Sequence, residues 1–145
     1  MKFVAQRVNR ATLSVNGQLV SEIGYGLVVY FGVKVGDTYK QAEKCMEKLA
    51  NLRIFEDEAG KMNRSVKDVK GEILLVSQFT LYGDTKKGNR PSFTEAEAPE
   101  KANAIYEYAL SYLQTLGVPV KKGVFGADMR IEQVNQGPVT IIYEI

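Results

Sequence analysis

The stretch of residues 72–82 constrains the fold of this chain more than any other. Four aliphatic residues in a row, at 73–76, follow Gly71 and precede a more polar segment. A half-exposed strand alternates apolar and polar residues, so an unbroken apolar run of this length indicates a strand that is covered on both faces. We therefore expect residues 72–82 to form a central strand of the fold.

Polar residues near the end of this strand indicate a site. Ser77, Gln78 and Thr80 interrupt a stretch that is otherwise apolar. An unpaired hydroxyl or amide group costs about 1–3 kcal/mol when it is buried, so these side chains should bond the backbone, a neighbouring loop or a ligand. The spacing alone does not decide between a ligand site and a polar strand end that is capped by its own turn.

The length and composition fit one globular domain that spans residues 1–145. Hydrophobic residues make up 45% and charged residues 25% of the chain, which excludes a disordered or low-complexity protein. A chain of 145 residues can bury a core without disulfides or metals. The net charge of +2 neither requires nor excludes a nucleic-acid partner.

The chain contains no histidine and a single cysteine, Cys45, and this limits its chemistry. Ser-His-Asp and Cys-His arrangements are excluded, and a zinc site is disfavoured. We expect no metal and no cofactor, so catalysis would use backbone groups, hydroxyls, carboxylates, lysine, arginine or the substrate itself. Cys45 falls on the apolar stripe of a predicted helix, which favours a packed thiol over a reactive one.

The sequence also indicates where the protein works. Its first residues become polar too early for a signal peptide, and no apolar segment reaches the roughly 18 residues that cross a bilayer. A lone cysteine fits a reducing compartment. We expect a soluble, cytoplasmic protein without membrane contact.

Local signals predict the other elements. Asn16-Gly17 is typical of a two-residue hairpin turn. Thr38 and Gln41 have the spacing of a capping box at the start of one helix, and Pro99 suits the first position of a second. Strands are expected at 3–8, 12–15, 18–23, 27–33, 53–55, 118–120, 128–134 and 139–143. Together these elements predict an α+β fold of curved, mostly antiparallel β-sheets in β/β/α layers, barrel-like, with two main helices packed on the outside.

One long connection, at 83–93, carries a cluster of basic residues. Lys86, Lys87 and Arg90 stand there beside two glycines and an aromatic residue. Loops of this length are often functional, so these cations fit phosphate contacts, although a solvated charged loop has the same composition.

A second connection, at 135–138, contains Gly137 and Pro138 between the last two predicted strands. Glycine adopts dihedral angles that other residues do not, and the bond before a proline can be cis. This loop is therefore more constrained than a generic hairpin loop.

Residues 77–81, Ser-Gln-Phe-Thr-Leu, and residues 137–140, Gly-Pro-Val-Thr, resemble the two signature motifs of the D-aminoacyl-tRNA deacylases, the D-tyrosyl-tRNA(Tyr) deacylase family. The resemblance runs from end to end of the chain. One departure is Gln136, where many members carry aspartate before the Gly-Pro pair. Further matching segments lie at 6–8, 52–55, 60–63, 90–93 and 126–129.

This resemblance implies an enzyme that hydrolyses the ester between a D-amino acid and the terminal ribose of tRNA. Main-chain groups around Gln78, Phe79 and Thr80 would stabilise the developing oxyanion, and the 2′-hydroxyl of the substrate would assist the attack. Thr80 is the nucleophile or a positioning residue in such an enzyme. We favour positioning, because no base adjoins its hydroxyl in the motif.

The resemblance further implies a homodimer whose active sites lie at the subunit interface. Gly137 and Pro138 would form a cis peptide that faces the amino-acid moiety in the partner's pocket, and Arg7 would hold this loop. Such a site would reject L-amino acids and would also accept glycyl-tRNA. The remaining substrate-binding residues that the resemblance implies are Ser77, Phe125 and Met129.

Two other classes of function stay open at this point. The chain could be a non-catalytic module that binds an RNA end, with its basic loop on phosphates and the polar strand end on a terminal nucleotide. It could also be a thiol enzyme built on Cys45, which the position of that residue on a helix stripe disfavours.

Overall fold

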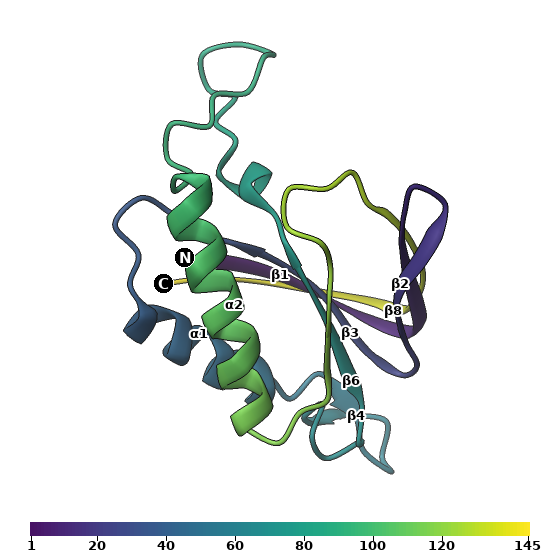
Figure 1. Ribbon diagram of the computed structural model, residues 1–145. Helices are drawn as coiled ribbons and strands as arrows, with labels where there is room; N and C mark the ends of the chain where they lie inside the picture. Colours follow the sequence, from purple (N-terminus) through teal and green to yellow (C-terminus); the bar gives the residue numbers. More distant parts are fainter.

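A six-stranded sheet forms the centre of the fold (Figure 1). The computed structural model describes residues 1–145, and its sheet has the order β2-β1-β3-β6-β7, with β8 pairing with β1. The strands of this sheet are β1 (Lys2–Val15), β2 (Gln18–Ile23), β3 (Gly26–Gly32), β6 (Glu72–Ser77), β7 (Val120–Lys122) and β8 (Arg130–Glu144). The other elements are the hairpin strands β4 (Phe55–Glu56) and β5 (Met62–Arg64), the helices α1 (Tyr39–Asn51) and α2 (Pro99–Thr115), and the 3-10 helix η1 (Phe79–Tyr82).

The sheet is mixed in direction. β1 runs antiparallel to β2, β3 and β8, while β6 runs parallel to both β3 and β7. The parallel pairs follow from the connections, because α1 lies between β3 and β6 in the chain and α2 lies between β6 and β7. The predicted α+β fold, with two helices outside a curved and mostly antiparallel sheet, is confirmed.

The sheet curls until its two ends approach each other. The Ser21 hydroxyl of β2 donates to the Lys122 carbonyl of β7 over 2.6 Å, although β2 and β7 stand at opposite ends of the strand order. This closure gives the barrel-like part of the fold. Its interior is a small apolar core of Val8, Ala11, Leu13, Ile23, Val28, Leu74 and Val76.

The larger core lies between the other face of the sheet and the helical layer, where α1 and α2 lie side by side (Figure 1). α1 begins after Thr38, which forms the predicted capping box with Gln41. α2 begins at Pro99, as predicted. The apolar stripe of α1 is buried in full and consists of Ala42, Cys45, Met46, Leu49 and Ala50.

The predicted hairpin is also present. Val15 pairs with Gln18, and Asn16 and Gly17 have φ values of 50° and 77°, as the turn requires. The short strand expected at 53–55 begins later, as β4. Neither α1 nor α2 has the length and apolar composition of a membrane-spanning helix.

The central strand is shorter than the sequence predicts. β6 ends at Ser77, and the residues that follow turn into η1, so the expectation of one strand through residue 82 was wrong. The Gln78 N–H still donates to the Phe31 carbonyl over 2.8 Å, but β3 ends one residue later, at Gly32. Without a neighbouring strand, the chain closes on itself through a hydrogen bond from the Gly83 N–H to the Thr80 carbonyl.

The last two predicted strands are one strand with a bulge. β8 pairs with β1 on both sides of the Gly-Pro segment, with Gln6 opposite Thr140 and Val8 opposite Asn135. One residue of β1, Arg7, therefore faces four residues of β8, at 136–139. The expected loop between separate strands was wrong, because a long β1 continues past the segment and recovers the pairing beyond it.

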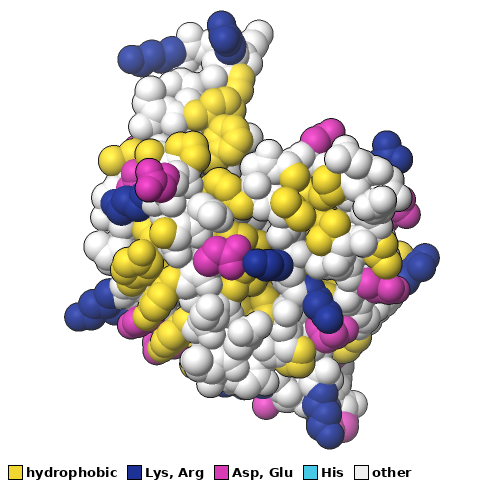
Figure 2. Space-filling view, viewed as in Figure 1, with side chains coloured by type: hydrophobic (Ala, Val, Ile, Leu, Met, Phe, Trp, Pro, Cys, Tyr) yellow, Lys and Arg dark blue, Asp and Glu magenta, His cyan; other side chains and the backbone are white.

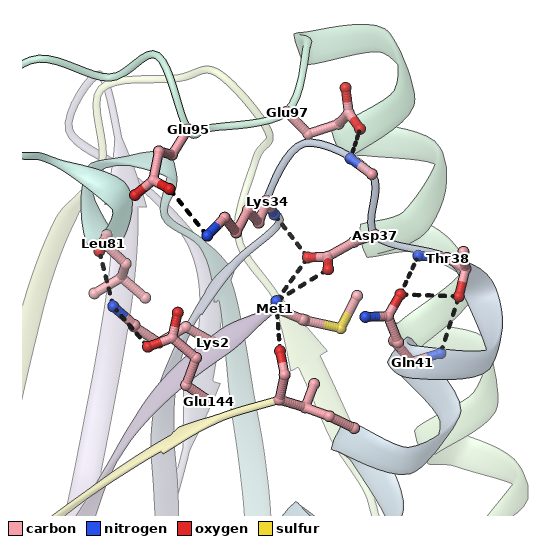
Figure 3. Close-up of polar contacts among 12 residues, drawn as sticks. Met1, Lys2, Lys34, Asp37, Thr38, Gln41, Leu81, Glu95, Glu97 and Glu144 are labelled. Atoms are coloured by element: carbon pink, nitrogen blue, oxygen red, sulfur yellow. Dashed lines mark hydrogen bonds and ion pairs between the residues drawn. The ribbon is translucent and has the colours of Figure 1, made fainter.

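A polar network joins both chain ends to the loop before α1 (Figure 3). The N-terminal ammonium of Met1 lies 2.8 Å from the Asp37 carboxylate, and both groups are buried. Asp37 also accepts from the Lys34 N–H over 2.7 Å, and the Ile145 N–H donates to the Met1 carbonyl over 3.0 Å. Because Lys34 forms an ion pair with Glu95 over 2.9 Å, this network also holds the segment that leads into α2.

Candidate active site

A cavity of about 650 Å³ opens where β6 ends and η1 begins. Apolar side chains make up most of its lining. In Figure 2, hydrophobic side chains gather at the base of the segment that protrudes at the top of the view, and Lys and Arg side chains lie at its tip. The lining residues come from β6, η1, the start of α2 and the segment before β8, and they include Ser77, Gln78, Phe79, Phe93, Ala98, Phe125 and Met129.

The main chain of η1 presents hydrogen-bond donors beside this cavity. The Phe79 and Thr80 N–H groups begin η1, so they have no carbonyl partner within it, and they donate no hydrogen bond to the turns around it. Gln78 precedes η1 without capping it through its side chain. Two adjacent main-chain donors thus stay available to a ligand.

The Thr80 hydroxyl is exposed and accepts a hydrogen bond from the Gln78 side-chain amide. An amide does not take up a proton near neutral pH, so this partner is not a base. The contact orients Thr80 and Gln78 relative to each other.

Aromatic packing fixes η1 on the outer side. The rings of Phe79 and Phe93 meet edge to face with centroids 5.0 Å apart. Phe79 still has 56% of its surface exposed, so it remains largely open to solvent. Phe93 ends the protruding connection at 83–93, and this contact couples the connection to the site.

The opposite wall comes from the segment before β8. Phe125 packs against the buried ring of Tyr106, with centroids 6.2 Å apart. The Tyr106 hydroxyl donates to the Leu75 carbonyl of β6 over 2.8 Å, and burial raises the pKa of this phenol. Met129 lies at the rim, next to a second, polar recess near the β1–β2 turn.

The sequence did not reveal the third wall, at residues 96–99. Glu97 lies there with its side chain only 10% exposed. Hydrogen bonds from Lys101 and from the Ala98 and Gly36 N–H groups lower its pKa to about 2, so the carboxylate is ionised. Pro99 did indicate where a helix begins, but such a signal does not say which cavity the helix end faces.

The Gly-Pro bulge stands apart from the cavity of its own chain. Gly137 and Pro138 are exposed, their peptide bond is cis, and neither residue lines the cavity. Gly137 has a φ of 117°, in the region that favours glycine, and an added Cβ would lie 2.9 Å from a Val139 methyl group.

Arg7 holds the bulge from the inner side. Its guanidinium is buried and donates to the Gln136 carbonyl over 3.3 Å and to the Ile54 carbonyl over 2.8 Å. On the outer side, Gln6 accepts from the Gln133 side chain over 2.8 Å and donates to the Thr140 hydroxyl. Arg7 therefore ties the bulge itself to β1, and Gln6 ties the residues on either side of the bulge to β1.

Two predicted groups lie away from the cavity. Lys86, Lys87 and Arg90 are exposed on the protruding connection. Cys45 is buried in the helical core, and burial raises the pKa of its thiol to about 12. A thiolate nucleophile at Cys45 therefore has no support in the structure.

The fold belongs to a known class of α+β proteins. A solved structure named c-Myc DNA Unwinding Element Binding Protein superposes with a TM-score of 0.95 at 45% identity, over 100% of this chain and 99% of that one. The family described as D-Tyr-tRNA(Tyr) deacylase matches residues 4–144.

Two curated relatives agree with this family. The D-aminoacyl-tRNA deacylase of Carboxydothermus hydrogenoformans is 56% identical over the full length of both chains, and that of Geobacter sp. (strain M21) is 54% identical over 99% of this chain and 97% of its own. The chain belongs to the D-Tyr-tRNA(Tyr) deacylase family. The resemblance noted in the motifs is thereby confirmed, and with it the prediction that the chain is a deacylase enzyme.

Proposed function

We propose that this enzyme hydrolyses the ester bond of D-aminoacyl-tRNA in the cytoplasm and releases the free D-amino acid and the tRNA. The observation that carries the proposal is the apolar cavity beside two unpaired main-chain N–H groups, those of Phe79 and Thr80. The aminoacyl group enters this cavity, and Ser77, Phe125 and Met129 contact it there.

In the proposed reaction, water adds to the ester carbonyl carbon and gives up one proton. The carbonyl oxygen becomes an oxyanion and accepts hydrogen bonds from the Phe79 and Thr80 N–H groups, each worth about 3–4 kcal/mol in comparable sites. The bond from this carbon to the ribose oxygen then breaks, and that oxygen takes a proton. The neighbouring 2′-hydroxyl of the ribose assists the proton transfer, which fits a site without histidine.

Thr80 acts in this proposal as a positioning residue. A nucleophilic hydroxyl needs an adjacent base, and the Thr80 hydroxyl has a side-chain amide as its partner. The Gln78 and Thr80 side chains orient the main chain that presents the two donors.

We further propose that a second copy of the chain completes the site, in a homodimer. Gly137 and Pro138 are exposed and lie outside the cavity of their own chain, so they are free to enter that of a partner. Val134 and Ile142, on the same strand, expose 41% and 68% of their surfaces, which suits a strand that a partner covers.

The proposed role of the Gly-Pro segment is chiral selection. One methylene is worth only about 1–3 kcal/mol in a pocket, so a cavity that takes many side chains does not reject an enantiomer by size. A main-chain wall that Arg7 holds in place excludes an L side chain by collision. Glycine has no side chain to collide, so glycyl-tRNA is cleaved as well.

The basic residues of the protruding connection complete the proposal. Lys86, Lys87 and Arg90 are exposed and form no ion pairs, which suits contact with phosphates near the 3′ end of the tRNA.

A turnover assay tests the proposed function. D-tyrosyl-tRNA should be cleaved and L-tyrosyl-tRNA spared. Thr80→Ala should retain part of the activity, whereas a substrate with a 2′-deoxy terminal adenosine should lose most of it. Normal cleavage of the 2′-deoxy substrate together with an inactive Thr80→Ala variant would instead make Thr80 the nucleophile. Binding of D-tyrosyl-tRNA without any cleavage would favour a non-catalytic RNA-end binding module.

A further inference from the structure

α1 carries its charges in two separate rows. Lys40, Lys44 and Lys48 recur every four residues and are all exposed, and we call them the lysine row. Glu43 and Glu47 form a second row beside it. Four residues rise about 6 Å along a helix, so each lysine has another lysine as its neighbour. Like charges at this spacing destabilise a helix. Lys40 and Lys44 stand three residues before Glu43 and Glu47, but neither lysine forms an ion pair with them that would compensate the repulsion.

The two glutamates are engaged by α2. The Tyr108 hydroxyl donates to Glu43, and the Tyr112 hydroxyl donates to Glu47 over 2.7 Å. The two tyrosine rings stack against each other with centroids 6.3 Å apart. The acids that could neutralise the lysine row therefore face the neighbouring helix.

The lysine row is left without counter-ions. None of its members takes part in an ion pair of this chain. Other exposed lysines, among them Lys61, Lys67 and Lys121, are also unpaired, so the lysine row is distinguished by its regular spacing along one helix. Lys48 lies 5.8 Å from the Tyr143 ring, and such a contact leaves its positive charge in place.

We infer that the lysine row is a docking surface for the phosphate backbone of the tRNA acceptor stem, beyond the 3′ end that enters the cavity. This inference rests on the proposed function. Charge complementarity selects the partner, because a helical row of three unneutralised cations matches a line of phosphates along one RNA strand. The contact reads no bases and adds affinity for any tRNA.

The position of α1 fits this role. Ala98 and Pro99, at the start of α2, line the cavity. α1 runs beside α2 in the same direction, since Tyr39 contacts Tyr108 with ring centroids 4.8 Å apart and Glu47 contacts Tyr112 further along. The nine residues from Pro99 to Tyr108 rise about 14 Å along α2, so α1 begins about this far along α2 from its cavity end and continues away from the cavity.

Two substrates separate this contact from the chemistry. One is D-tyrosyl-tRNA, and the other is the D-tyrosyl ester of adenosine, which lacks an acceptor stem. A variant with Lys40→Gln, Lys44→Gln and Lys48→Gln should show a KM for D-tyrosyl-tRNA about tenfold higher, with an unchanged kcat. The slope of log KM against log salt concentration should fall by about two to three. Cleavage of the adenosine ester should not change.

Two matched variants serve as controls. Replacing all three residues by arginine keeps the charge and should preserve the KM. A variant with Lys61→Gln, Lys67→Gln and Lys121→Gln loses the same charge at exposed sites elsewhere and should leave the KM near that of the wild type. The thermal unfolding midpoint of the lysine-row variant should change little, because the relief of repulsion along α1 offsets the loss of the Lys48 contact with the Tyr143 ring.

Each contrary result has a definite meaning. An unchanged KM and salt slope, an equal effect in the control variant, or an equal loss on the adenosine ester would overturn the lysine-row inference alone. A wild-type protein that cleaves neither substrate would overturn the proposed function and this inference together.

Discussion

At the scale of single residues, main-chain groups are the most important feature of the candidate site. The sequence directed attention to the side chains of Ser77, Gln78 and Thr80, because polar residues in an apolar run are visible in a one-letter code. The unpaired Phe79 and Thr80 N–H groups are not visible there, since they depend on where β6 ends. The absence of histidine made backbone groups one of several candidates, and the resemblance to a family pointed to those around residues 78–80. The assignment of the Phe79 and Thr80 N–H groups as oxyanion donors stays a prediction.

Phe79→Pro tests the main-chain donor directly. Proline suits the first position of a helix, and Gln78, with a φ of −145° and a ψ of 88°, lies outside the α region that a following proline disfavours. The variant removes the Phe79 N–H and the aromatic ring, whereas Phe79→Ala removes only the ring. Relative to Phe79→Ala, we expect kcat to fall about 10²–10³-fold, measured by single-turnover cleavage of D-tyrosyl-tRNA. Equal rates for the two variants would remove this N–H from the mechanism.

At the scale of elements, local signals predicted well and long-range ones did not. The capping box at Thr38 and the proline at the start of α2 lie next to the features they specify, and both helices were predicted. The end of β6 depends on the end of β3, and the continuity of β8 depends on the length of β1. The paired strands, β6 with β3 and β8 with β1, are far apart in the sequence, so no short stretch of sequence contains both strands of a pair. The predicted end of β6 and the predicted break in β8 were therefore wrong.

Gly32 links β3 to the position of η1. An added Cβ would lie 3.1 Å from the Gln78 carbonyl oxygen and 3.2 Å from atoms of both Leu81 and Tyr82. Gly32→Ala should therefore push η1 outward by a few tenths of an ångström and lower kcat about tenfold, because small misplacements of catalytic groups are costly. Gly24→Ala is the matched control, since its added Cβ would meet only Glu72 at 3.7 Å. A normal kcat for Gly32→Ala would show that η1 tolerates this displacement.

At the scale of the whole molecule, the two signature segments lie in different places. The cavity and η1 form one region, and the Gly-Pro bulge lies outside it, on β8. Their separation within one chain is what a site shared between two subunits requires. Residue types and spacing do not reveal this separation, because they carry no direction in space, and only the resemblance to the family implied it.

Mixing two inactive variants tests the shared site. Gly137→Val damages the bulge, since its φ of 117° is unsuited to a branched residue, and Phe79→Pro damages the η1 donor. Each variant alone should be impaired. Refolded together, they should form heterodimers in which one of the two sites is intact, and up to about a quarter of the wild-type activity should return for random pairing. Confirmed heterodimers without activity would place both segments in the same subunit's site.

The bulge on β8 also bears on how this protein can change over time. A one-residue insertion in an ordinary strand moves every later side chain to the opposite face of the sheet. Here the pairing of β8 with β1 stops at Asn135 and resumes at Thr140, so the residues between them do not set the register of the sheet. Residues 136–139 can therefore change without moving the register of the flanking strand segments, provided that the packing of Val139 against the core and the hydrogen bond from Arg7 to the Gln136 carbonyl are kept. Within that limit, a lineage or a protein engineer can vary selectivity in this segment while the scaffold stays constant.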